Sequence, residues 1–240
     1  MAFKAFLKSA ALAGAMALAS AAASAATVSL TYNGGTSTGT AKITAAPLGV
    51  PPVGVTPTLS TPWHVGAYGF NMTDSTLGGL GSFVAWCLDI SHYLGTSGPQ
   101  AYQTTTMPFS SRPVNVGRVQ RVFDANYASV ISSNATQMKT AAAGFQVALW
   151  NALYDTDWLA GSGNFAVQAG TTSTRADAYL LAASAFGGPR AYNLTFLEST
   201  GTPIRQHLGT ATPVPLPAAG LLLLAALGGL GLARRRRKAA

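Results

Sequence analysis

Two side chains in the middle of the sequence are of types that can react with each other. Cys87, the single cysteine, lies in the apolar segment Ser82–Ile90, and Gln146 lies in the apolar segment Thr140–Tyr154. A deprotonated thiol is the strongest nucleophile among the ordinary side chains. A buried carboxamide without a hydrogen-bond partner costs about 1–3 kcal/mol. Gln146 is therefore expected either to have hydrogen-bond partners or to have reacted.

Attack of the Cys87 sulfur on the Gln146 carboxamide would release ammonia and leave an internal thioester. An amide is a poor electrophile in water, but a fixed geometry raises its effective concentration by up to about 7–11 kcal/mol. Backbone N–H groups would stabilise the oxyanion, and the aromatic neighbours Trp86, Phe145 and Trp150 are expected to exclude water. An amine that displaced the sulfur would stay bound to Gln146, in a single attachment without turnover.

Two short motifs resemble a known family. Trp86-Cys87-Leu88-Asp89 and Phe145-Gln146-Val147-Ala148-Leu149-Trp150 are similar to the paired motifs of thioester domains in bacterial surface adhesins. The resemblance spans roughly residues 83–157 and implies a Cys87–Gln146 thioester. This chain differs from the adhesin motif at two positions. Phe145 stands where a Thr is usual, and Asn151 stands where an acidic residue often follows the Trp.

Other interpretations of these residues remain open at this stage. Cys87 is also explained as a small core residue, since free cysteine is among the most buried residue types, and Gln146 as a satisfied core amide. An intermolecular disulfide through Cys87 is a third possibility outside the membrane. If the thioester forms, His92 is a possible base, and Asp89 is a possible orienting group because a regular strand would place it on the Cys87 face.

Both ends of the chain carry features of sorting signals. Residues 1–26 have the basic start, short apolar run and small residues of a secretory signal peptide. The C-terminal residues 214–240 contain an apolar run, predicted as a transmembrane helix over 218–233, followed by the basic cluster Arg234, Arg235, Arg236 and Arg237. Basic residues hold such a tail on the cytoplasmic side.

The C-terminal segment resembles a PEP-CTERM sorting signal in its VPLPA variant. The motif is Val214, Pro215, Leu216, Pro217 and Ala218, ahead of the apolar helix and the arginines. The resemblance implies an exported bacterial protein that an exosortase-type enzyme cleaves and passes to the cell surface or extracellular matrix. A permanent single-span membrane anchor is the alternative.

Composition excludes several classes of function. Seven of the 15 basic residues lie at the two ends, so the middle carries eight basic against seven acidic residues. This balance leaves no basic stripe for a nucleic acid. One cysteine excludes a disulfide framework and a cysteine metal cluster. We expect no cofactor and no metal, and the absence of hydrolase, nucleotide and zinc motifs predicts a non-enzyme.

Hydrophobic periodicity predicts one α+β domain, with N-terminal antiparallel strands packed against a helical subdomain. The domain is expected over residues 27–199, with a linker over 200–213. Strands are predicted over 27–32, 40–45, 65–72, 82–90 and 193–199, with a hairpin at Asn33-Gly34-Gly35 joining the first two. Helices are predicted over about 118–131, 140–154 and 174–186, the last with a Thr174–Asp177 capping box.

The sequence thus predicts an exported surface or matrix protein that attaches covalently to an amine-bearing polymer through Cys87 and Gln146. The competing hypothesis is a structural or carbohydrate-binding matrix protein without covalent chemistry.

Overall fold

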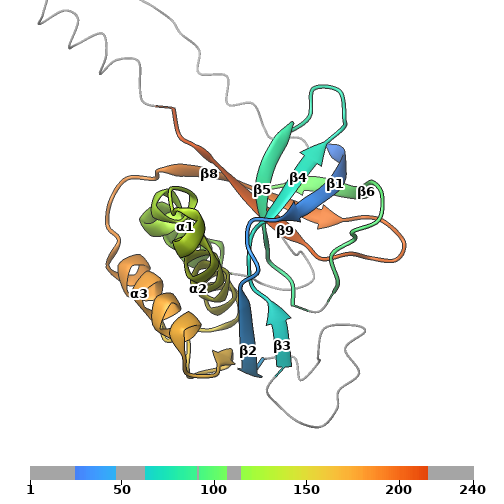
Figure 1. The fold of residues 1–240 in the computed structure, drawn as a ribbon. Coiled ribbons are helices and arrows are strands. Elements are labelled where there is room, and N and C mark those ends of the chain that lie inside the picture. Colours follow the sequence, from blue (N-terminus) through green and yellow to red (C-terminus); the bar gives the residue numbers. More distant parts are fainter. Residues whose placement is uncertain (1–24, 47–62, 91, 107–114, 216–240) are drawn as a thin grey trace, which may run out of the picture.

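The computed structural model describes residues 25–46, 63–90, 92–106 and 115–215 of the 240-residue chain. These residues form two antiparallel sheets and three helices, which confirms the predicted α+β class (Figure 1). The strands are β1 (Thr27–Gly35), β2 (Thr40–Ala45), β3 (Trp63–Gly66), β4 (Phe70–Asp74), β5 (Ser82–Cys87), β6 (Gln100–Thr105), β7 (Ala166–Val167), β8 (Tyr192–Ser199) and β9 (Leu208–Pro213). The helices are α1 (Val116–Ile131), α2 (Ala135–Tyr154) and α3 (Thr171–Ala185).

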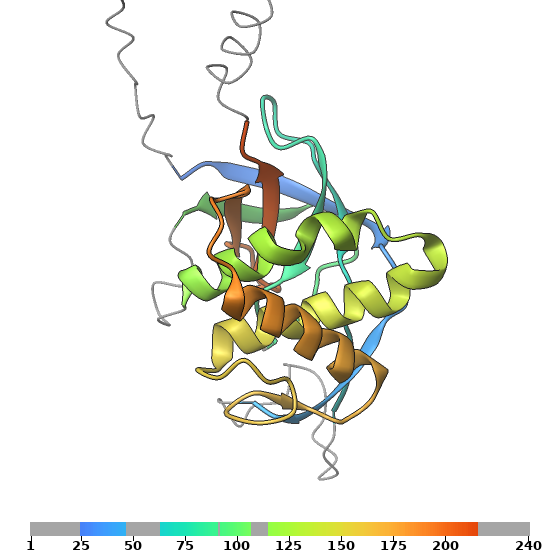
Figure 2. The same cartoon turned by 90° about the vertical axis from the view of Figure 1, so that its left-hand side faces the viewer.

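Six strands close into a barrel in the order β1-β4-β5-β9-β8-β6, and the three remaining strands form a second sheet in the order β3-β2-β7. Closure leaves no barrel edge open to another chain. The three helices pack on one side of the barrel, next to β8 and β2 (Figures 1 and 2). The strand that ends at Cys87, β5, is one of the six barrel strands, and Gln146 of α2 forms hydrogen bonds with its last residue.

The predicted hairpin between residues 27–32 and 40–45 is wrong. Both strands exist, but β1 pairs with β4 and β6 in the barrel, whereas β2 pairs with β3 and β7 in the second sheet. The expected turn at Asn33–Gly35 belongs to β1, where the register with β4 shifts between Tyr32 and Gly35. Gly34 adopts a φ of 112°, so the glycine marks a bulge in place of a hairpin turn.

Two predicted strands are shorter or broken in the structure. The segment 65–72 divides into β3 and β4. Residues 67–69 between them belong to no strand, and the two strands lie in different sheets. The segment 82–90 forms strand only as far as Cys87. Leu88, Asp89 and Ile90 are buried but follow an irregular path. An uninterrupted run of apolar residues indicates burial, and in this segment the burial continues past the last residue of β5.

The predicted linker over 200–213 is also wrong in its second half. Leu208–Pro213 form β9, which lies between β5 and β8 and completes the barrel. Its Leu208 is fully buried. The segment LGTATP carries little hydrophobic alternation, so its strand conformation is determined by the two neighbours that pair with it.

The three predicted helices are confirmed, with α2 and α3 starting a few residues earlier than expected. Asn115 caps α1 and Asn134 caps α2, each accepting a hydrogen bond from a backbone N–H of the first turn. The predicted Thr174–Asp177 capping box of α3 is wrong. The Ser173 hydroxyl accepts from the Gly170 N–H, and Asp177 accepts from the Ala160 N–H at 2.7 Å.

Asp74 organises the connection between β4 and β5. Its carboxylate accepts hydrogen bonds from the N–H groups of Ser29, Thr76 and Leu80 at 3.4, 2.9 and 2.8 Å. Burial alone would raise the pKa of Asp74, but these hydrogen bonds outweigh it and lower the pKa. The ionised carboxylate therefore holds the connection in place.

Asp74→Asn is expected to lower the free energy of unfolding by about 1–2 kcal/mol at pH 7, because charge-assisted hydrogen bonds are replaced by weaker ones. A lowered carboxyl pKa contributes stability above the unfolded value near 3.9 and loses it as the pH falls through the folded value. Urea unfolding at pH 7 and pH 3 measures both. An equal difference between wild type and variant at the two pH values would contradict the assignment.

No helix among the described residues is long and apolar enough to cross a membrane. The predicted signal peptide, apart from Ala25 and Ala26, and the predicted transmembrane helix at 218–233 lie outside the described residues. The same holds for Leu216, Pro217 and Ala218 of the sorting motif and for the arginines 234–237. These features stay predictions from the sequence.

Candidate functional site

Gln146 and Cys87 lie against each other in the core. The Cys87 N–H donates to Gln146 Oε1 at 3.0 Å, and Gln146 Nε2 donates to the Cys87 carbonyl oxygen at 2.7 Å. We call these two hydrogen bonds the amide pair. Gln146 is fully buried and Cys87 is 1% exposed. Residues 59 positions apart in the sequence are thus joined by a reciprocal contact that excludes water.

The strand order explains why a side chain fills this position. On one side β5 pairs with β9, with Cys87 opposite Leu208. On the other side β4 begins at Phe70, which is opposite Ala85, so β4 does not reach Cys87. The backbone groups of Cys87 would be buried without partners at this edge, which is costly. The carboxamide of Gln146 extends from α2 and continues the ladder that β4 leaves incomplete.

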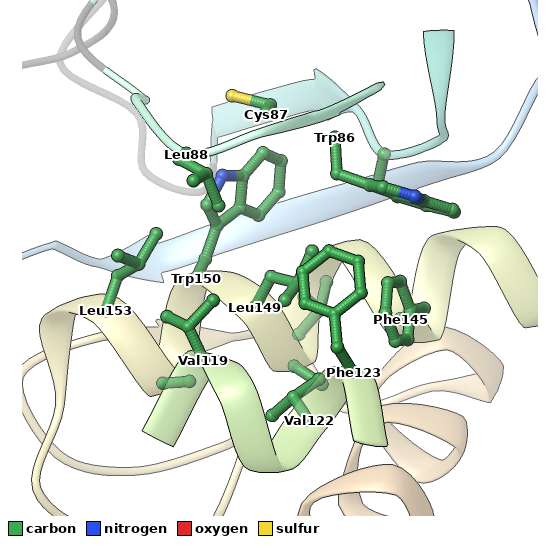
Figure 3. Close-up of a cluster of buried hydrophobic side chains, with 14 of the residues drawn as sticks. Trp86, Cys87, Leu88, Val119, Val122, Phe123, Phe145, Leu149, Trp150 and Leu153 are labelled. Carbon is green, nitrogen blue, oxygen red and sulfur yellow. The ribbon is translucent and has the colours of Figure 1, made fainter. Parts of the chain in front are cut away.

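The carboxamide carbon of Gln146 is covalently bonded to Oε1 and Nε2, the two Gln146 atoms that form the amide pair. It is therefore held beside the backbone of Cys87, which is the residue whose sulfur would attack it. In Figure 3 the Cys87 sulfur points away from the helices, whereas Trp86 points toward them.

The Cys87 sulfur lies in a local turn made by the chain that follows it. Sγ donates to the Asp89 carbonyl oxygen at 2.9 Å and accepts from the Asp89 N–H at 3.4 Å. Burial raises the pKa of the Cys87 thiol, and the Asp89 carboxylate raises it further, while the Asp89 N–H and the Trp150 indole lower it. The folded state therefore holds the thiol protonated, so a reaction needs a group that accepts this proton.

The Asp89 carboxylate is shared by two histidines. Its Oδ2 lies 2.5 Å from His92 Nδ1 and 4.0 Å from His207 Nε2, and the two imidazole rings are 6.0 Å apart. The Asp89 side chain is 5% exposed, whereas His92 and His207 are 27% and 21% exposed. Gln206 Nε2 donates to the Asp89 carbonyl oxygen at 3.0 Å. This Asp89–histidine cluster connects the buried sulfur with the surface.

The predicted pocket residues surround the amide pair with aromatic rings. Trp86 contacts Phe145 with ring centroids 4.7 Å apart, and Phe145 contacts Phe123 and Tyr127 at 5.2 and 5.8 Å. Figure 3 shows the rings of Trp86 and Trp150 on the helix-facing side of the strand end that carries Cys87. Among the described residues, the indole nitrogens of Trp86 and Trp150 are buried without a hydrogen bond of good geometry.

The predicted site residues fall into two groups. The structure brings together Cys87, Gln146, Asp89, His92, Trp86, Phe145 and Trp150, although Asp89 comes close to Cys87 through a turn and not through a regular strand. The sorting-motif residues Val214 and Pro215 lie at the end of the described chain, away from β5, and the remaining sorting and membrane residues are outside it.

Three functional neighbours were missed by the sequence interpretation. They are Gln206 and His207, in the segment predicted as linker, and Tyr154, whose hydroxyl donates to the Leu88 carbonyl oxygen at 3.1 Å. The Leu88 N–H donates to the His207 carbonyl oxygen at 2.9 Å, so strand pairing places His207 there. The only sequence signal for His207 was its residue type, because the whole chain has three histidines.

Ionisable groups near the site predict a loss of stability at alkaline pH. Burial raises the pKa of Tyr102, with a further increase from Cys87 and Asp89, and its hydroxyl donates to the Gln206 carbonyl oxygen at 3.0 Å. A raised pKa contributes stability below the unfolded value, near 10 for tyrosine, and loses it as the pH rises toward the folded value. Urea unfolding at pH 8 and pH 11 should show this decrease. Tyr102→Phe should show a smaller one, and an identical decrease would contradict the assignment.

Two of the solved structures that are similar to this chain are domains of bacterial surface proteins. The N-terminal domain of the Streptococcus pyogenes pilus tip adhesin Cpa is 13% identical, with a TM-score of 0.41, and the match covers 61% of this chain and 85% of that one. The N-terminal thioester domain of a surface protein from Clostridium perfringens is 10% identical, with a TM-score of 0.42, covering 79% and 100%. No family model and no curated protein matches the sequence.

Proposed function

We propose that this protein forms an internal thioester between Cys87 Sγ and the Gln146 carboxamide carbon and uses it to attach covalently to amines. The observation that carries the proposal is the amide pair, which holds that carbon beside Cys87 in a site closed to water. Holding the reactants together supplies much of the barrier reduction that an amide electrophile needs.

The proposed chemistry has two steps, which are thioester formation and amine capture. The Cys87 sulfur attacks the Gln146 carboxamide carbon, the new S–C bond forms, and the C–N bond breaks. Ammonia leaves with the proton of the thiol. An amine that later attacks the same carbon expels the sulfur, which regains a proton as Cys87, and a secondary amide to Gln146 remains. The thioester is stable only while water is excluded, and the buried aromatic rings of Trp86, Phe145 and Trp150 provide that exclusion.

Intact-mass spectrometry of freshly purified protein tests the proposal. The wild-type mass is expected to be one ammonia below the sequence value, and methylamine should then raise it by one methylamine. Peptide mapping should locate the added methylamine on Gln146. An unshifted native mass that methylamine leaves unchanged would exclude the thioester.

Cys87→Ser is the matched control, because it replaces only the sulfur and keeps both backbone groups of the amide pair. It should show the sequence mass and no methylamine adduct. A mass deficit that persisted in this variant would assign the loss of ammonia to another residue.

For localisation, we propose export through the signal peptide over 1–26 and sorting through the tail over 214–240. The tail would anchor the protein in the inner membrane until an exosortase-type enzyme acts on it, and the domain would then reach the cell surface or the extracellular matrix. The support is the order of motif, apolar run and arginine cluster in the sequence. The amine-bearing partner would be a surface or matrix polymer.

A second candidate is a structural matrix protein without covalent chemistry. The amide pair itself favours it, because Gln146 satisfies both backbone groups of Cys87 and needs no further role. Stacking of a sugar on aromatic side chains receives less support, because the Tyr102 ring is buried and the Trp158 ring is covered by the Arg118 guanidinium at 3.8 Å. The native mass separates this candidate from the thioester.

A further inference from the structure

The Asp89–histidine cluster has a chemical asymmetry that the thioester alone does not require. The Ser199 N–H donates to His207 Nδ1 at 3.0 Å, so this nitrogen acts as an acceptor and carries no proton. The proton of neutral His207 is then on Nε2, the nitrogen that faces Asp89 Oδ2. In this neutral form, the Nε2–H of His207 faces the carboxylate, with Nε2 4.0 Å from Asp89 Oδ2.

His92 has the opposite arrangement. Its Nδ1 lies 2.5 Å from Asp89 Oδ2, so in the neutral ring the proton between them is on Nδ1 and Nε2 carries the basic lone pair. A carboxylate behind an imidazole orients the ring and stabilises its protonated form. His92 is also the more exposed histidine of the cluster, at 27%.

The sulfur and this cluster belong to one continuous arrangement. Both the N–H and the carbonyl oxygen of Asp89 contact Cys87 Sγ. Four further residues surround this arrangement. Tyr102 interacts electrostatically with both Asp89 and Arg205. The Tyr154 hydroxyl donates to the Leu88 carbonyl oxygen, and Gln206 Nε2 donates to the Asp89 carbonyl oxygen. Arg205 donates to Gln100 Oε1 at 3.3 Å, and both tyrosines donate their hydroxyl protons to backbone carbonyl oxygens. His92 Nε2 is therefore the imidazole nitrogen of this arrangement that does not face the Asp89 carboxylate and that carries a basic lone pair in the neutral ring.

We propose that His92 is the general base for amine capture at the thioester, with Asp89 and His207 as its positioning residues. This inference rests on the proposed function. An incoming neutral amine attacks the Gln146 carboxamide carbon, and its nitrogen loses a proton to His92 Nε2. The C–S bond breaks, and the departing Cys87 thiolate takes a proton from the His92 imidazolium. The products are a secondary amide and a free thiol.

The test measures the rate of methylamine capture by intact mass as a function of pH, using the full chain. In wild type, after correction for the fraction of neutral amine, the rate should rise with pH. In those His92→Gln molecules that carry the ammonia deficit, capture of methylamine should lose this dependence and be at least about 10-fold slower at pH 7. Imidazole should restore the rate of His92→Ala, which a purely structural role would not allow.

The positioning residues have distinct expected effects. Asp89→Asn should lower the midpoint of the pH profile, because the imidazolium loses its carboxylate. His207→Gln should reduce the rate less than His92→Gln while keeping a pH-dependent profile. An ammonia deficit with an unchanged rate and profile in His92→Gln overturns the inference and leaves the thioester intact. A wild type without the deficit overturns both.

Discussion

A chain that ends after Ser199 is expected to lose cooperative folding. This truncation removes β9, which pairs with both β5 and β8, and it removes the buried side chain of Leu208. The barrel would open between these two strands and leave unpaired backbone groups on both of them. The cost of these unpaired backbone groups, together with the lost burial of Leu208, is expected to exceed the typical domain stability of about 5–15 kcal/mol. Thermal unfolding followed by circular dichroism should show no sharp transition.

A chain that ends after Pro215 is the matched control, because it keeps β9 and lacks the same tail. It should unfold in one sharp transition. Equal transitions in the two truncated chains would show that β9 is dispensable and that residues 200–213 act as the linker predicted from the sequence.

Replacement of Gln146 by alanine is expected to lower the free energy of unfolding by about 3–6 kcal/mol. The change removes both hydrogen bonds of the amide pair and leaves the N–H and carbonyl groups of Cys87 buried without partners. Each unsatisfied buried group costs about 1–3 kcal/mol, and the cavity adds to this. Urea unfolding should be measured in a Cys87→Ala background, so that no covalent bond contributes.

Asn126→Ala provides a matched comparison. Asn126 is a buried amide that donates to the Val122 and Tyr179 carbonyl oxygens, both of which lie within helices. These carbonyls keep their helical hydrogen bonds when the side chain is removed, so the expected loss is about 1–2 kcal/mol. A loss for Gln146→Ala no larger than this would contradict the structural role of the amide pair.

The elements that the sequence predicted well are those with a strong local signal. The α1 and α2 helices follow from hydrophobic periodicity, and β2 coincides with its predicted segment. The elements that were missed depend on distant partners. β9 is polar and short and acquires its conformation from β5 and β8, and the separation of β1 from β2 depends on the sheet that each strand joins.

The same division applies to the candidate site. Cys87 and Gln146 were identified because each is a polar or reactive residue in an apolar segment, which is a local anomaly. His207 could not be assigned to the site because the pairing of β9 with β5 places it there. The turn that brings Asp89 to Cys87 could not be predicted from the sequence either, because the apolar character of the segment continues past the last residue of β5.

β9 is the last strand of the barrel in the sequence, and this position has a consequence for the order of synthesis. The strand that carries Cys87 lacks one neighbour, and the site lacks His207, until the ribosome has made nearly all of the described chain. Cys87 and Gln146 are both present well before that point. Assembly of the candidate site is therefore completed by one of the last segments of the described chain.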